Sequence, residues 1–210
     1  MSVLEKISYY QQRRDEVPNQ ELARELVRAR DLAGIAEIAE NLTNKNKNIS
    51  SDCLKVLYES GYIDPTLTAP YVEDFLRLLA SRDNRMVWGA MIALANIADL
   101  RPLEIWAKIE LVLSTVKDGS VITVVWGVRV LAKTAAANPA YNLKIFPLLV
   151  EILKTCIPRD VPTHAESMLP AVNRDNLDQF KAVILLRQPE LSPAQLSRTK
   201  KLLRQIENLN

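Results

Sequence analysis

The side chains that most often carry out catalysis or bind metals are few in this chain. His164 is the only histidine, and the two cysteines, Cys53 and Cys156, lie far apart in the sequence. Zinc and haem sites need several such ligands close together, so the ligand count excludes them. The 210 residues contain no glycine-rich phosphate-binding motif and no GxSxG or HExxH motif. We therefore expect a structural or solvated role for His164, no catalytic, metal or cofactor site, and no enzymatic activity.

Two Trp-Gly pairs, Trp88-Gly89 and Trp126-Gly127, are the most suggestive remaining pattern. Exposed tryptophans are known to stack on nucleic-acid bases, whereas partly buried ones fill the seams between packed helices. The neighbours of both pairs are apolar rather than basic, namely Val87, Met91, Val125 and Val128. This favours packing between helices over base stacking for both tryptophans.

The elements that would position these residues follow a repeat of 37 residues. Pro65, Pro102 and Pro139 recur at this spacing, each within a turn signal. Around them, apolar residues recur three and four positions apart, which places them on one face of a helix. Markers of the first helix of each unit include Ile35, Phe75, Val112 and Leu149; small residues mark the second helix at Cys53, Ala90, Gly127 and Ala165. A two-helix unit of this length is typical of a solenoid.

The pattern predicts one continuous domain. We expect capping helices in 1–30, four repeats in 31–64, 65–101, 102–138 and 139–173, and a degenerate repeat in 174–210. The predicted helices lie near 31–43, 50–60, 68–80, 84–98, 102–117, 121–137, 141–156 and 161–172. Ser2 with Glu5 resembles a capping box, Asn19 is a good N-cap for a second leading helix, and Ser50 and Ser51 are candidate caps for the helix near 50–60.

A polar stripe on the second helices is the candidate partner-binding surface. Counting two and six residues past each small residue gives pairs at i,i+4, which face the same way. The candidate partner-binding residues are Lys55, Glu59, Asn96, Arg129 and Lys133. If the second helices line the concave side, this stripe is the floor of the groove. Its mixed charge suits a peptide or protein segment better than a phosphate backbone, which requires a run of basic residues.

Residues 70–83, followed by Ala90, Ala93 and Leu94, resemble a HEAT repeat. The unit that contains Asp118, Gly127 and Leu131 resembles it almost as well, although Val87 and Val124 stand where the family usually has a basic residue. The resemblance covers about residues 31–172. It implies an all-α, right-handed α-α superhelix of about four HEAT-like (armadillo-type) helical hairpins, with capping helices at both ends.

Composition is that of an ordinary soluble protein, with a net charge of +2. The charge is uneven, −3 over residues 1–105 and +5 over residues 106–210, which favours a polar or acidic partner for the second half. The first residues lack the layout of a secretion signal, and no run of 18 apolar residues occurs. We therefore expect a cytoplasmic protein that does not span a membrane.

These observations predict a non-enzymatic interaction or scaffold module that binds a protein or peptide partner in the groove. One alternative is a nucleic-acid-binding or DNA-repair protein that uses Arg129, Lys133, Arg174 and the basic segment Arg198–Arg204. Another follows from the resemblance alone: a small-molecule binder similar to the phycobilin lyases of the HEAT-like class. The sequence leaves these alternatives open.

Overall fold

The computed structural model describes residues 2–207, and within this range every regular element is helical. The chain divides into two compact units, residues 1–127 and 128–210, which are described separately below. The all-α fold class expected from the repeat pattern is confirmed. No helix among the described residues is both long and apolar enough to cross a membrane.

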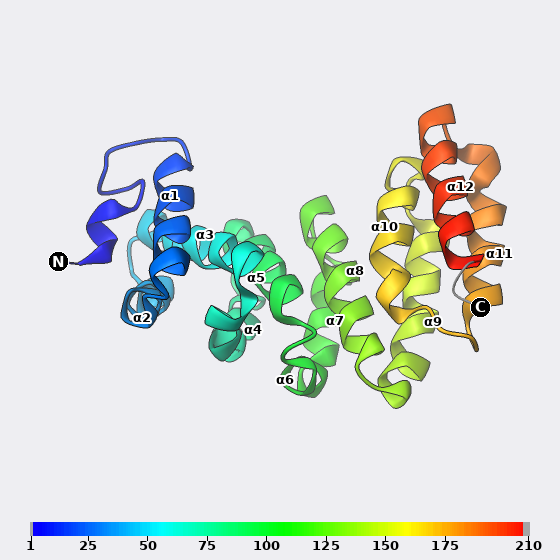
Figure 1. Ribbon diagram of the computed structural model, residues 1–210, viewed down its shortest axis with the longest axis horizontal. Helices are drawn as coiled ribbons and strands as arrows, with labels where there is room; N and C mark the ends of the chain where they lie inside the picture. Colours follow the sequence, from blue (N-terminus) through cyan, green and yellow to red (C-terminus); the bar gives the residue numbers. More distant parts are fainter. Residues whose placement is uncertain (1, 208–210) are drawn as a thin grey trace. The chain divides into compact units, whose positions relative to one another are not determined.

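The first unit begins with a 3₁₀ turn, η1 (Val3–Lys6), followed by α1 (Val17–Ala29), which packs against α3 (Lys47–Ile63) (Figure 1). The capping role expected of Ser2 is confirmed, since its Oγ accepts a hydrogen bond from the Leu4 amide. The prediction for Asn19 was wrong. Asn19 lies inside α1, and its side chain is buried because it joins the Ser8 amide to Asp52.

The next helical hairpin consists of α2 (Leu32–Glu40), a short turn η2 (Asn41–Thr43) and α3. α3 begins three residues earlier than expected. Asn46 caps it by accepting a hydrogen bond from the Asn48 amide at 3.0 Å. The expectation that Ser50 and Ser51 cap this helix was therefore wrong, and both residues lie in its first turns. A side chain in the polar linker reaches the free amides first, so the helix starts there.

The rest of the first unit follows the expected order of helices, with two differences. A 3₁₀ turn, η3 (Pro65–Leu67), precedes the helix expected at 68–80, and a second one, η4 (Ala69–Tyr71), replaces its first part. The helix expected at 102–117 is broken at Lys108, whose backbone departs from helical geometry at φ −119°. The helices are α4 (Val72–Leu78), α5 (Asn84–Ile97), α6 (Pro102–Ala107), α7 (Ile109–Lys117) and α8 (Val121–Ala136), the last of which contains the division at Gly127.

The described part of the second unit adds four α-helices: α9 (Pro139–Thr155), α10 (Val161–Met168), α11 (Leu177–Arg187) and α12 (Pro193–Glu207). Within this unit, α9 packs against α10 and α11, and α10 packs against α12. A buried amide network holds the turn before α11. Asn142 donates to the Ala171 carbonyl at 2.7 Å, and Asn176 donates to Asn142 at 3.0 Å.

The marker positions of the repeat pattern form the core. Phe75, Val112 and Leu149 are completely buried, as the periodicity predicts. The small residues of the second helices are buried too, and at Gly127 the reason is direct: a Cβ there would overlap a methyl group of Val116 on α7. Close approach of α7 and α8 in the first unit therefore depends on the missing side chain.

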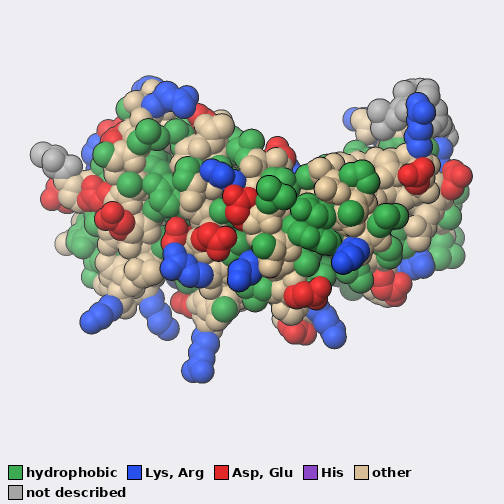
Figure 2. Space-filling model, turned by 90° about the horizontal axis from the view of Figure 1, so that it is seen from below, with side chains coloured by type: hydrophobic (Ala, Val, Ile, Leu, Met, Phe, Trp, Pro, Cys, Tyr) green, Lys and Arg blue, Asp and Glu red, His purple; other side chains and the backbone are tan. Residues whose placement is uncertain are grey.

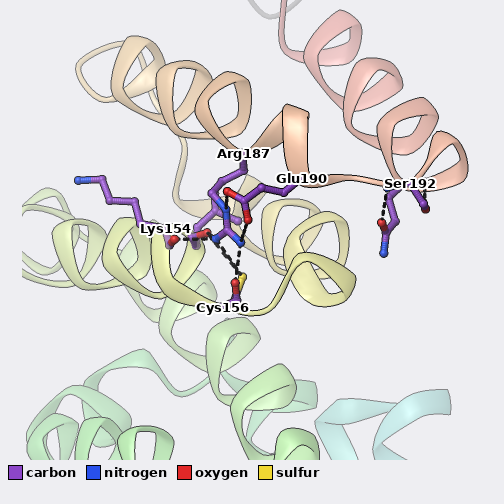
Figure 3. A network of polar contacts seen from close by, with 7 residues as sticks. Lys154, Cys156, Arg187, Glu190 and Ser192 are labelled. Atoms are coloured by element: carbon purple, nitrogen blue, oxygen red, sulfur yellow. Dashed lines mark hydrogen bonds and ion pairs between the residues drawn. The ribbon is translucent and has the colours of Figure 1, made fainter.

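A buried arginine closes the end of α9 in the second unit (Figure 3). Arg187 is 5% exposed, and its guanidinium donates to the carbonyl oxygens of Leu153, Lys154 and Cys156 at 2.8, 2.6 and 2.7 Å. Its Nε and Nη2 also bind both carboxylate oxygens of Glu190 at 3.0 Å. Carbonyl oxygens at a helix C-terminus lack partners within the helix, so a buried cation satisfies both their hydrogen bonds and the helix dipole.

Candidate functional site

The residues most able to carry chemistry are buried or isolated. Burial raises the pKa of the Cys53 thiol to about 12, so this side chain is a protonated core residue at neutral pH. Cys156 is half-buried and lies beside the Arg187 cluster. Within residues 2–207, no three His, Cys, Asp or Glu side chains come together in a way that could hold a metal ion.

His164 is 1% exposed on α10, and its Nδ1 has no hydrogen-bond partner among the described residues. Burial lowers the pKa of His164 because a charged imidazole is poorly solvated in the core, and the nearby charge of Asp160 opposes this only in part. The imidazole is therefore neutral in the folded protein at neutral pH.

We expect His164 to make the protein less stable as the pH falls below 6.5, the ordinary pKa of histidine. In that range the unfolded chain binds a proton that the folded chain excludes, so the free energy of unfolding falls by up to about 1.4 kcal/mol per pH unit until the folded pKa is reached. Denaturation at several pH values measures the slope. Because His164 is the only histidine, His164→Leu should remove this component between pH 6.5 and 5. An unchanged slope in that variant would contradict the assignment.

The first unit contains a pocket of about 600 Å³ between the N-terminal segment, α3 and α5. Aromatic and charged side chains share its walls. Those used below are Tyr9, Arg13, Arg14, Asp15, Glu16, Asp52, Lys55, Tyr58, Arg85 and Trp88. A concave site with aromatic walls and a few converging polar groups is the usual form of a ligand-binding pocket.

The three acidic side chains of the pocket all have partners within the chain. Asp52 accepts from the Tyr9 amide at 2.7 Å and from the Asn19 side chain at 2.9 Å. Asp15 pairs with Arg13 at 3.0 Å, and Glu16 pairs with Lys55 at 2.7 Å. The contacts of Asp52 and Glu16 fix the N-terminal segment against α3. Cations neutralise Asp15 and Glu16, whereas Asp52 accepts hydrogen bonds from neutral donors.

Lys55 lies at the centre of these contacts. Its Nζ is 2.8 Å from Glu59, one turn further along α3, and 4.8 Å from the centre of the Tyr58 ring. Although burial lowers the pKa of Lys55, its hydrogen bonds to Glu16 and Glu59 outweigh this effect and hold the pKa above its ordinary value. The lysine is therefore a permanent cation that ties the N-terminal segment to the second helix of the first repeat.

A row of aromatic rings continues from this pocket across α3, α5 and α8. Tyr58 lies 6.3 Å from Trp88 and 6.0 Å from Tyr62, and Tyr62 lies 5.8 Å from Trp126, measured between ring centres. Both tryptophans are half-buried. The interpretation of Trp88 and Trp126 as packing residues between helices is confirmed, since each contacts a tyrosine of another helix. Their partial exposure leaves part of each residue at the surface.

The structure uses the predicted partner-binding residues mainly for internal contacts. Lys55 and Glu59 are brought together as an ion pair, and Asn96 donates to the Tyr58 carbonyl at 3.0 Å, which joins α5 to α3. In the second unit, Arg129 donates to Ser167 at 3.3 Å, and Lys133 is half-buried one turn further along α8. Their role in partner binding stays a prediction.

Sequence reasoning missed the pocket residues Tyr9, Arg14, Asp52 and Arg85. The only available signal was the charged run from Arg13 to Glu16, which precedes the second leading helix. Nothing local indicates that this run folds back on α3, since Tyr9 and Asp52 are 43 positions apart.

Charges of both signs are distributed over the surface of the first unit. Figure 2 shows one face, and on its left side, over the first unit, Lys and Arg side chains alternate with Asp and Glu side chains and with hydrophobic ones. Neither sign forms a continuous field on that face. A nucleic-acid backbone is bound through such a field, so this face lacks that property.

Solved structures show what this arrangement of helices is similar to. An engineered protein matches with a TM-score of 0.68 at 19% identity, over 99% of this chain and 100% of its own. A designed armadillo repeat protein in complex with the peptide (KR)4 matches with a TM-score of 0.67 at 13% identity, over 88% and 85%. A computationally designed armadillo repeat protein for modular peptide recognition matches with a TM-score of 0.64 at 14% identity, over 88% and 85%.

This chain has an armadillo/HEAT-like helical-repeat fold. The resemblance drawn from residues 70–83 and the Ala90 segment is thereby confirmed at the level of fold. No protein-family model and no curated protein sequence matches the chain. Because the sequence identities are below 20%, these structural similarities show the armadillo/HEAT-like fold and say nothing about activity.

Proposed function

We propose that this armadillo/HEAT-like chain is a non-enzymatic scaffold that binds a peptide or protein segment along its second helices. The observation that carries the proposal is the aromatic row on α3, α5 and α8, which continues from the 600 Å³ pocket and in which Trp88 and Trp126 are half-buried and Tyr62 is exposed. Aromatic side chains with a part still exposed are the residues that most often anchor a bound segment. Structures of similar fold include a designed protein in complex with a peptide, which is consistent with this use of the fold.

The predicted partner-binding residues are Lys55, Glu59 and Asn96 in the first unit; Arg129 and Lys133 form a separate part of the prediction, in the second unit. The internal contacts of these residues hold their polar groups in fixed positions. Side chains fixed in this way lose little conformational entropy when a partner arrives, so they favour specific binding.

Selection from a random peptide library displayed on phage tests the proposal, with the intact chain as the immobilised target. We expect selected peptides to bind in solution and to lose about tenfold in affinity when Arg129→Glu and Lys133→Glu are combined, a change equivalent to about 1.4 kcal/mol. Lys154→Glu with Lys181→Glu makes the same change in net charge on α9 and α11, and should leave the affinity within about twofold. A library that yields no binding peptide would contradict the scaffold proposal.

The nucleic-acid alternative finds less support. Its basic segment on α12 begins at Arg198, which binds Glu166 through two hydrogen bonds of 3.0 and 2.6 Å and is thereby partly neutralised. If the chain bound generic duplex DNA at low salt, with a steep loss of affinity as salt is added, the nucleic-acid alternative would replace the scaffold proposal. The phycobilin-lyase-like alternative predicts a change in absorbance on mixing with pigment.

A further inference from the structure

Two arginines of the pocket in the first unit form no ion pair with any residue that the structure describes. Of the four basic side chains that line it, Arg13 pairs with Asp15, and Lys55 pairs with Glu16 and Glu59. The guanidinium groups of Arg14 and Arg85 are exposed, and across residues 2–207 no hydrogen bond or ion pair involves them. Asp15 and Glu16 are paired with cations, whereas Asp52 accepts only from neutral donors and keeps its negative charge. Four basic and three acidic side chains line the pocket, so its net charge is +1.

Aromatic and apolar walls stand beside these two arginines. Tyr58 is 5% exposed, and Trp88 is half-buried one turn after Arg85 on α5. Gly89 also lines the pocket, and its missing side chain leaves the methyl groups of Leu54 in contact with the backbone of α5. The volume of about 600 Å³ lies in the range of sites that hold a few peptide residues.

We propose that this pocket binds an acidic peptide segment. A Glu or Asp carboxylate of the partner would pair with Arg14 and Arg85, and a neighbouring aromatic or aliphatic side chain would pack on Trp88. The proposal rests on the scaffold function proposed above and names the chemistry of the partner at one place. Arginine suits this task because its planar guanidinium binds a carboxylate through two parallel hydrogen bonds.

The same walls distinguish a carboxylate from a phosphate group. Asp52 keeps its negative charge in the pocket wall, so a group with two negative charges would be repelled by it more strongly than a single carboxylate. Together with Asp52, the two arginines leave a net charge of +1, which one carboxylate balances. The aromatic wall adds affinity only for a ligand with an apolar part, which a peptide supplies and a free phosphate lacks.

Isothermal titration calorimetry with three unlabelled eight-residue peptides tests the proposal on the full chain. The first alternates Glu and Phe, the second replaces each Glu by Lys, and the third replaces each Phe by Ser. We expect the Glu/Phe peptide to bind at least about tenfold more tightly than either of the others, since each lacks one half of the complementary chemistry. Equal affinity for the Glu and Lys peptides would overturn the proposal.

Charge reversal tests whether Arg14 and Arg85 are the residues that bind the peptide. Arg14→Glu combined with Arg85→Glu should weaken the Glu/Phe peptide by about tenfold or more and strengthen the Lys/Phe peptide, a swap that a loss of structure does not produce. The matched control is Arg24→Glu with Arg82→Glu, which reverses two exposed arginines outside the pocket. It should leave both affinities within about twofold. The proposal is wrong if the Arg14/Arg85 variant binds both peptides as the unmodified chain does.

Two further outcomes separate this inference from the scaffold function. If the phage library yields binding peptides while the Glu/Phe peptide fails to bind, the acidic-segment inference is wrong and the scaffold proposal stands. If inorganic phosphate displaces the Glu/Phe peptide and the Glu/Ser peptide binds equally well, the pocket is a simple anion site, which also contradicts the inference.

Discussion

Replacing Arg187 by leucine is expected to lower the free energy of unfolding by about 2–5 kcal/mol, because buried carbonyl oxygens at the end of α9 would lose a charged hydrogen-bond donor. The side chain is 5% exposed and donates to three carbonyl oxygens at the end of α9, as well as to Glu190. Leucine fills much of the volume but donates no hydrogen bond, so these carbonyl oxygens would be left without their partner. Denaturant unfolding followed by far-UV circular dichroism measures the loss.

Two variants make the Arg187 test specific. Arg187→Lys keeps the charge but lacks the planar guanidinium that reaches several carbonyl oxygens at once. We therefore expect Arg187→Lys to lose more than about half as much stability as Arg187→Leu. Arg159→Leu removes an exposed arginine that pairs with Asp160, and it should change stability by no more than about 0.5–1 kcal/mol. A loss below about 1 kcal/mol for Arg187→Leu would show that water satisfies the carbonyl oxygens instead.

Replacing Phe75 by alanine is expected to lower the free energy of unfolding by about 3–5 kcal/mol. The side chain is completely buried on α4, at a first-helix marker position, and α4 packs mainly against α5. The substitution removes the ring from a close-packed core, and the cavity adds to the lost transfer free energy because the helices relax only in part.

Leu103→Ala is the matched control for Phe75, because Leu103 is 68% exposed on α6 in the same unit. Leu103→Ala should lower the free energy of unfolding by no more than about 0.5 kcal/mol. Equal effects of the two substitutions in the same denaturation assay would mean that the first-helix markers do not form the core. The repeat register would then be wrong.

The partner surface combines residues with different availability. Lys55, Glu59 and Asn96 are engaged inside the fold, whereas Arg14 and Arg85 have unused hydrogen-bonding capacity. A bound segment that pairs with the first group must compete with existing contacts, while one that pairs with the two arginines gains new ones. This difference is why we place the specific contact at the pocket rather than along the polar stripe.

The sequence by itself determined the repeat and the core. Burial of one helix face imposes a spacing of three and four residues, so Phe75, Val112 and Leu149 are recognisable without any tertiary information. The turn prolines are equally local, since the ring fixes its own backbone angle at the start of a helix. The ion pair of Lys55 and Glu59 follows from their i,i+4 spacing in the same way.

Helix ends were less predictable from the sequence. Asn46, Ser50 and Ser51 all have side chains that cap helices well, and the structure shows that Asn46 is the one whose oxygen reaches a free amide. Asn19 was misassigned because its amide group joins Ser8 to Asp52 instead of capping a helix. The choice between neighbouring candidates depends on contacts with other segments.

Only the tertiary structure decided where the pocket lies. Glu16 and Lys55 are 39 positions apart, and Tyr9 and Asp52 are 43 apart, so no periodicity links them. Packing of α1 on α3 brings the N-terminal segment over the second helix. Only then are some charges neutralised, while Arg14 and Arg85 form no ion pair with the described part of the chain. Helical periodicity is a property of neighbouring residues, whereas the balance of charge in a pocket depends on which distant segments meet.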